Sequence, residues 1–188
     1  MEITKATIFF FDMDGTLINT NVANFLSYKA ALSIVTGKDI SFMSYNPMER
    51  FNRSRLKSLF PSLTESDYER IIREKEMCYK NYLSETTIVK ENVEVLLKYS
   101  ATHKMVLVTN CRKERALETL SYHGLTDKFT NLFYRYTTLV TQKINKYQKA
   151  INLLGISPKN IIVFENEESE IADAMEAGIK IINPQILL

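Results

Sequence analysis

Predominantly apolar runs alternate with amphipathic segments along the second half of the chain, and one further apolar run lies near its start. The apolar runs occupy residues 6–11, 105–109, 129–136, 161–164 and 179–182. Runs that are apolar throughout, rather than at every second position, are typical of strands buried on both faces of a parallel sheet. The segments between them carry apolar residues at three- and four-residue spacing, which predicts helices over 90–99, 112–122, 145–154 and 168–177.

Glycines mark the ends of three of these predicted helices. Gly155 and Gly178 directly follow predicted helices, and Gly124 comes two residues after the end of a third. Glycine readily adopts the left-handed conformation that ends many helices. Strands that alternate with helices in this way favour an α/β fold in which crossover helices cover both faces of a sheet. We therefore predict a doubly wound parallel sheet.

Residues 19–87 have a different pattern: apolar residues recur with helical periodicity, and there are no β-branched runs. Helices are predicted over 21–36 and 64–84, with a shorter one between 47 and 61. Residues 64–67 read Thr-Glu-Ser-Asp, a pattern that resembles a capping box at the start of the second helix. We expect one domain formed by residues 1–18 and 88–188, and a helical domain, 19–87, inserted after the first strand.

Composition narrows the class of protein. The 188 residues have a net charge of +2, which gives no electrostatic argument for binding nucleic acid. Two cysteines are too few for a disulfide scaffold and suit a reducing compartment. No apolar run approaches the ~18 residues of a membrane span, and no signal-peptide pattern precedes Asp12. We expect a cytoplasmic monomer or small homo-oligomer without nucleic-acid or membrane partners.

Polar residues follow several predicted strands. The first strand ends in Asp12-Met13-Asp14-Gly15-Thr16, a later one in Thr109-Asn110, and another in Glu165-Asn166. Lys143 and Lys146 come just before the helix that leads into the last of these strands. In open parallel sheets, ligands bind outside the carboxyl ends of the strands, so we expect these side chains to form one site.

These motifs resemble those of the haloacid dehalogenase (HAD) superfamily, in particular its phosphatases and β-phosphoglucomutase-like members. Residues 11–17 match the family's DxDGT motif, residues 108–110 match its second motif, and residues 163–166 resemble its fourth motif. The resemblance covers the whole chain. It implies a Rossmann-like HAD core with a helical cap inserted after the first strand.

The resemblance also implies a mechanism and a set of roles. Asp12 is expected to attack phosphorus and form an aspartyl-phosphate, and Asp14 to act as general acid and base. Thr109 and a lysine are expected to stabilise the transferring phosphoryl group. The expected substrate contacts come from Gly15, Thr16 and Asn110, with Mg²⁺ bridging the nucleophile and the phosphate.

Each of these residues also has a purely structural interpretation. Asp12 to Gly15 would also suit a plain turn, and Thr109-Asn110 would suit a helix cap. Either Lys143 or Lys146 would suit a solvated surface position. Lys143 is favoured as the catalytic lysine because its distance from Gly155 is similar to that in phosphoserine phosphatases, with Lys146 as the alternative.

One position departs from the family pattern. Asn166 stands where an aspartate is expected to bind the metal, and Glu165 and Glu170 are the nearby acids that would compensate. The expected metal ligands are Asp12, Asp14 through its backbone carbonyl, Glu165, Asn166 and Glu170. An amide oxygen brings no charge to Mg²⁺, so we expect weak metal binding.

The inserted segment is expected to select the substrate. Arg55 lies in a stretch, 54–59, that resembles the cap segment contacting a distal substrate group, although a solvated basic helix face would have the same pattern. Asn24 stands where a mutase would have its acid/base histidine, which weakens a mutase interpretation, and Asp14 argues against a dehalogenase. The leading hypothesis is an Mg²⁺-dependent phosphatase of a small phosphorylated metabolite. The alternatives are a sugar-phosphate mutase and a catalytically weak protein that binds phosphorylated ligands.

Overall fold

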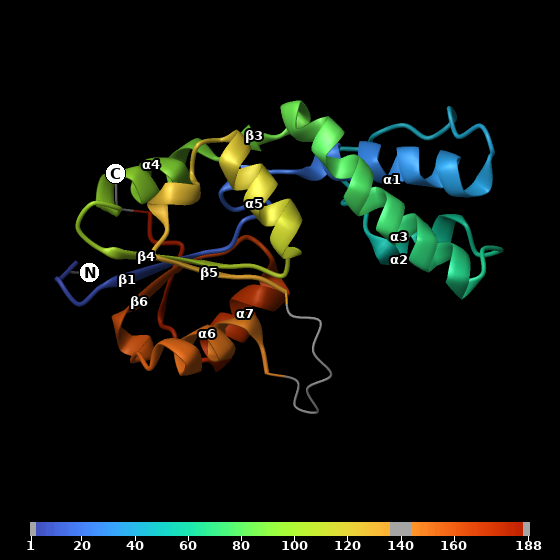
Figure 1. Ribbon diagram of the computed structural model, residues 1–188. Coiled ribbons are helices and arrows are strands. Elements are labelled where there is room, and N and C mark those ends of the chain that lie inside the picture. Colours follow the sequence, from blue (N-terminus) through green and yellow to red (C-terminus); the bar gives the residue numbers. More distant parts are fainter. Residues whose placement is uncertain (1–2, 136–143, 186–188) are drawn as a thin grey trace. The chain divides into compact units, whose positions relative to one another are not determined.

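A computed structural model describes residues 3–135 and 144–185 (Figure 1). Five strands form one sheet in the order β5-β4-β1-β6-β7. Their bounds are β1 Ile8–Phe11, β4 Lys104–Val108, β5 Asn131–Phe133, β6 Ile161–Phe164 and β7 Ile181–Ile182. Every neighbouring pair is parallel. The predicted doubly wound parallel sheet is confirmed.

Helices cover both faces of this sheet. Figure 1 shows α4 (Lys90–Tyr99) and α5 (Lys113–Tyr122) over one face, with α6 (Lys146–Leu154) and α7 (Glu168–Glu176) over the other. Single 3₁₀ turns, η2 (Thr126–Lys128) and η3 (Pro158–Asn160), precede β5 and β6. The arrangement is the one that right-handed crossover connections produce.

The side chains of β1 show why its apolar run is continuous. Phe9 and Phe11 join the core cluster that contains α4 and α5 residues, whereas Phe10 joins the cluster of α6 and α7. All three phenylalanines are fully buried. Because successive side chains of a strand point to opposite faces, a strand covered on both faces needs apolar residues at every position.

Residues 19–87 form a separate compact unit. It contains α1 (Asn21–Thr36), α2 (Arg53–Leu59), α3 (Glu65–Tyr79) and the 3₁₀ helix η1 (Lys80–Glu85), and it has its own buried cluster around Leu32, Leu56 and Ile71. The other unit consists of residues 1–18 and 88–188. The chain crosses between the units in β2 (Ile18–Asn19) and β3 (Thr87–Ile88), which form a two-stranded sheet.

Several elements are shorter than their sequence patterns predict. The predicted helix 64–84 ends as an α-helix at Tyr79 and continues as η1, where Tyr82 departs from helical geometry. Of the aromatic run 129–136, the part that the structure describes, 129–135, contributes Asn131–Phe133 to the sheet. Within the described residues, no helix is both long and apolar enough to cross a membrane.

Candidate active site

The candidate site lies at the carboxyl edge of the sheet. Asp12 directly follows the central strand β1, Thr109 follows β4, and Glu165 follows β6. Strand β1 pairs with β4 on one side and with β6 on the other. The chain therefore reverses its direction of winding at β1, which is the position where open α/β sheets bind ligands.

A tight loop follows Asp12. The carbonyl of Met13 accepts hydrogen bonds from the amides of Thr16, Leu17 and Ile18, at 3.3, 3.1 and 3.0 Å. Gly15 has φ = +87°, and a Cβ built on it would lie 2.6 Å from Asn166 Nδ2. The backbone conformation thus favours glycine at this position, and a larger residue would displace the Asn166 side chain.

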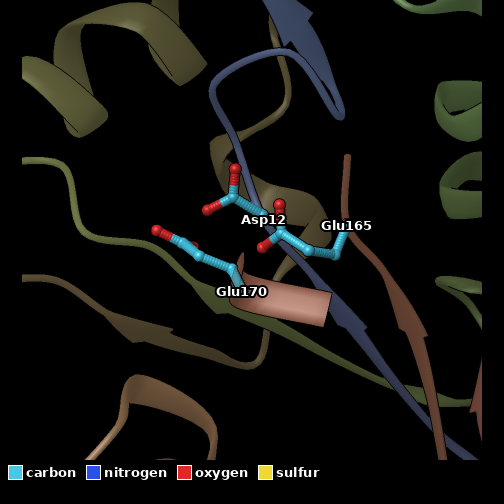
Figure 2. A group of neighbouring side chains, drawn as sticks. All are labelled: Asp12, Glu165 and Glu170. Atoms are coloured by element: carbon cyan, nitrogen blue, oxygen red, sulfur yellow. The ribbon is translucent and has the colours of Figure 1, made fainter. Parts of the chain in front are cut away.

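Lys146 brings three carboxylates together. Its Nζ donates hydrogen bonds to Asp12 Oδ1 at 2.8 Å and to Glu165 Oε2 at 2.7 Å, and it also pairs with Glu170. Figure 2 shows the carboxyl groups of Asp12, Glu165 and Glu170 directed toward one another. Lys146 is the first residue of α6, whose N-cap is Asn145. The favoured residue, Lys143, lies outside the described residues, so Lys146 is the lysine that the structure brings to Asp12.

Four donors among the described residues surround the Glu165 carboxylate. Its Oε2 accepts from Lys146 and, at 2.6 Å, from the Tyr147 hydroxyl, while its Oε1 accepts from the amides of Asn166 and Glu167. These bonds use the about four acceptor positions of a carboxylate. The Asn183 side chain holds the Glu165 backbone as well, accepting from its amide and donating to its carbonyl.

Burial and charge set the protonation of this cluster. Burial raises the pKa of Asp12 to about 7, although Lys146 acts in the opposite direction. Burial also acts to raise the pKa of Glu165, but Lys146 and the Tyr147 hydroxyl outweigh it and hold that pKa below its usual value. Burial acts to lower the pKa of Lys146, and the surrounding carboxylates overcome it and keep the pKa above its ordinary range. Lys146 is therefore a fixed positive charge beside Asp12.

Other predicted residues lie around the same cluster. The Thr109 side chain is buried, and its Oγ1 accepts from the amide of Cys111 at 3.1 Å. Asn110 Nδ2 donates to Glu170 Oε1 at 2.8 Å. The Thr16 hydroxyl donates to Asn166 Oδ1 at 2.9 Å, which ties the first motif to the fourth.

Arg55 and Asn24 belong to the 19–87 unit. The Arg55 guanidinium pairs with Glu49 at 2.8 Å, so its charge is partly balanced within the unit. Asn24 is buried and donates to the Thr20 hydroxyl at 3.1 Å. The structure therefore gives both residues contacts inside their own unit, and their roles toward a substrate stay predictions.

Sequence reasoning missed three residues of the site. Tyr147 and Asn183 support Glu165, and Arg115 on α5 pairs with Asp14, its Nη2 lying 3.3 Å from Asp14 Oδ2. Tyr147 was detectable as the neighbour of a candidate lysine. Arg115 and Asn183 gave no such signal, because only the fold brings them to the first and fourth motifs.

Comparisons with known proteins extend over most of the chain. A family model described as haloacid dehalogenase-like hydrolase matches residues 9–183. Pyrophosphatase PpaX of Halalkalibacterium halodurans is 27% identical over 185 residues, which covers 90% of this chain and 79% of that protein.

Solved structures with low sequence identity share the fold. A predicted phosphoglycolate phosphatase from Haemophilus somnus 129pt has a TM-score of 0.76 at 20% identity, covering 96% of this chain and 85% of the other. CbbY from Rhodobacter sphaeroides, in complex with phosphate, has a TM-score of 0.74 at 14% identity, covering 96% and 87%. The order of the motifs along the sheet edge, the fold and the match of the family model over nearly all of the chain agree: this protein belongs to the haloacid dehalogenase-like hydrolases.

Proposed function

We propose that the protein is a phosphatase that hydrolyses a small phosphorylated metabolite through an aspartyl-phosphate on Asp12. The observation that carries this proposal is the contact of Lys146 with both Asp12 and Glu165 at the end of the central strand. A carboxylate held beside a permanent cation is able to approach a phosphate dianion that would otherwise repel it.

The reaction has two steps. In the first, a carboxylate oxygen of Asp12 forms a bond to phosphorus, and the bond from phosphorus to the leaving oxygen breaks. The electron pair stays on the leaving oxygen, which takes a proton from Asp14. In the second, a water oxygen attacks the same phosphorus, Asp14 accepts the proton of that water, and Asp12 and inorganic phosphate are released.

The carboxylates also suit Mg²⁺. Ligand oxygens of Asp12, Glu165 and Glu170 all lie within 4.8 Å of one another, and carboxylate oxygens are the ligands that this ion prefers. Lys146 contacts all three of these carboxylates, and Glu165 has further donors of its own. We propose that Asp12, the backbone carbonyl of Asp14, Asn166 and Glu170 would hold the ion. When bound, Mg²⁺ would supply positive charge to the reacting phosphate.

The remaining residues of the site have supporting roles. Lys146 would balance the charge that develops on Asp12 and the phosphoryl group, with Glu165 and Tyr147 fixing its position. The buried Thr109 hydroxyl would donate to a phosphoryl oxygen, and the Gly15 loop would allow backbone amides of the first motif to do the same. Asn110 would contact the substrate from the end of β4.

The names of the similar proteins favour a phosphorylated substrate. One is a pyrophosphatase, one is a predicted phosphoglycolate phosphatase, and one holds phosphate. We propose the 19–87 unit, with Arg55, as the cap that selects among such compounds.

Hydrolysis of p-nitrophenyl phosphate with and without Mg²⁺ tests the proposal, with Asp12→Asn as the variant. We expect Mg²⁺-dependent release of phosphate by the natural protein and none by Asp12→Asn, which preserves side-chain size. Undiminished turnover by Asp12→Asn contradicts the covalent mechanism. A panel of phosphorylated metabolites then identifies the substrate. Interconversion of glucose phosphates would indicate a mutase instead, and binding without turnover would indicate a ligand-binding protein.

A further inference from the structure

Arg115 lies beside the proposed general acid. Its Nη2 is 3.3 Å from Asp14 Oδ2, and its Nε donates to Cys111 Sγ at 2.9 Å. The amide of Cys111 in turn donates to the Thr109 hydroxyl at 3.1 Å. A continuous set of contacts therefore holds the guanidinium between the end of β4 and the end of β1.

The side chains of this ion pair are mostly buried yet reachable. The Arg115 side chain is 13% exposed and that of Asp14 is 9% exposed. A partly buried guanidinium interacts more strongly with nearby charges than one that is exposed on the protein surface. The planar guanidinium also has several donors, which suit phosphate oxygens. Nothing in the proposed two-step reaction requires a second cation here, since Lys146 already faces Asp12.

The position of Arg115 identifies the part of the substrate that it would meet. Arg115 donates to Asp14 Oδ2, and the other carboxyl oxygen of Asp14 would carry the proton that goes to the leaving oxygen. A cation in contact with Asp14 is therefore one hydrogen-bonding group away from the leaving group. Lys146, in contrast, contacts Asp12, the proposed nucleophile that receives the phosphoryl group. The two cations thus serve the two ends of the bond that breaks.

We propose that Arg115 makes the site selective for phosphoanhydrides, whose leaving group is itself a phosphate, over esters with an uncharged leaving group. In a phosphoanhydride the anionic oxygens of the leaving phosphate are attached to the phosphorus next to the bridging oxygen. These oxygens lie close enough to meet a cation beside Asp14. The group that leaves with the electron pair is itself an anion, so a cation stabilises it. This inference rests on the proposed function and adds the substrate class to it.

The test compares the hydrolysis of inorganic pyrophosphate with that of phenyl phosphate. It uses the natural protein and three variants at the same excess of Mg²⁺. Arg115→Gln removes the charge, and Arg115→Lys keeps it. Arg112→Gln is the matched control, because Arg112 is exposed and directly precedes α5. Circular dichroism checks that each variant is folded.

We expect Arg115→Gln to raise the KM for pyrophosphate about tenfold to a hundredfold, the loss typical of a charge-assisted hydrogen bond. The KM for phenyl phosphate rises much less than that for pyrophosphate, Arg115→Lys restores part of the loss, and Arg112→Gln changes neither KM. Equal losses on both substrates would mean that Arg115 only positions Asp14, and the proposed selectivity would be wrong.

A binding measurement separates this inference from the proposed function. Calorimetric titration of the Asp12→Asn protein with pyrophosphate and with phosphate, in the presence of Mg²⁺, does not require turnover. If the Asp12→Asn protein binds pyrophosphate more tightly than phosphate, and Asp12→Asn/Arg115→Gln does not, the role of Arg115 is supported even if the covalent mechanism is wrong. Equal affinity for pyrophosphate and phosphate overturns it, even if the protein is a phosphatase.

Discussion

Asp12 is a carboxyl group that the protein holds almost without solvent. It is 5% exposed, and burial raises its pKa to about 7 from the ordinary value of 3.8. The folded protein therefore keeps this proton at pH values where the unfolded chain has lost it. Stability due to this group is greatest below pH 4 and falls as the pH rises toward 7.

This shift predicts that Asp12→Asn stabilises the metal-free protein at neutral pH. The amide cannot ionise, so the variant should not show the loss of stability between about pH 4 and 7 that ionisation of Asp12 causes. Urea unfolding of both proteins in the presence of a chelator, at several pH values, measures the difference. A gap that narrows as the pH rises would contradict the assigned environment of Asp12.

Tyr147 is expected to contribute both stability and activity through Glu165. Tyr147→Phe removes the 2.6 Å hydrogen bond to Glu165 Oε2, a buried charged acceptor for which Lys146 is then the one donor left among the described residues. We expect a loss of about 1–3 kcal/mol in the free energy of unfolding, and reduced activity because Lys146 is less firmly placed. Tyr122→Phe, at an exposed tyrosine, is the control. Unchanged urea unfolding of Tyr147→Phe would mean that this hydrogen bond adds nothing to stability.

Asn166 is expected to determine the affinity for Mg²⁺. Replacing it by aspartate adds a formal negative charge to the proposed ligand set, so Asn166→Asp should tighten Mg²⁺ binding from about millimolar affinity. Glu170→Gln should weaken it. Calorimetric titration with MgCl₂ measures both changes, and activity against Mg²⁺ concentration provides a second measurement. If Asn166→Asp leaves the affinity unchanged, Asn166 is not a ligand.

At the scale of elements, the capping box at the N-terminus of α3 gives a prediction confined to the 19–87 unit. Thr64 accepts from the amide of Asp67, and the Asp67 carboxylate accepts from the amide of Thr64. Thr64→Ala should cost about 1 kcal/mol in urea unfolding, whereas Ser66→Ala, in the same turn but outside this reciprocal pair, should cost little. Hydrolysis of p-nitrophenyl phosphate should be unchanged in both.

The elements also show what a sequence pattern can predict. The run of phenylalanines in β1 predicts a strand covered on both faces, since each face contributes its own apolar contacts. The same reasoning finds the polar residues at the strand ends, because parallel strands end at one edge. It does not find Arg115, because the spacing of residues on α5 does not reveal that one of them contacts a loop 101 residues away. The preference for Lys143 over Lys146 rests on spacing alone; Lys143 lies outside the described residues, so that preference stays a prediction, whereas Lys146 contacts Asp12.

At the scale of the whole molecule, each of the two units has its own hydrophobic core. The cluster around Leu32, Leu56 and Ile71 contains only residues of the 19–87 unit, and the two clusters on the sheet contain none of them. Strands β2 and β3, where the chain enters and leaves this unit, pair with each other. A short linker is therefore able to replace the segment between them.

We expect a chain in which a Gly-Ser linker replaces residues 20–86 to fold and to hydrolyse p-nitrophenyl phosphate. It should lose discrimination among phosphorylated metabolites, because the proposed cap is absent. Circular dichroism and the metabolite panel measure these two outcomes. Unchanged discrimination would contradict the role proposed for the 19–87 unit.

The central position of β1 has a consequence for synthesis of the protein on the ribosome. Both neighbours of β1 come much later in the chain, β4 beginning at Lys104 and β6 at Ile161. The 19–87 unit is complete before either neighbour has been made, and its own core allows it to fold first. Meanwhile Ile8–Phe11 emerges as an apolar strand with two open edges, the kind of segment that aggregates or engages chaperones. The strand that ends at Asp12 is thus translated well before both of its partners and has to wait for them.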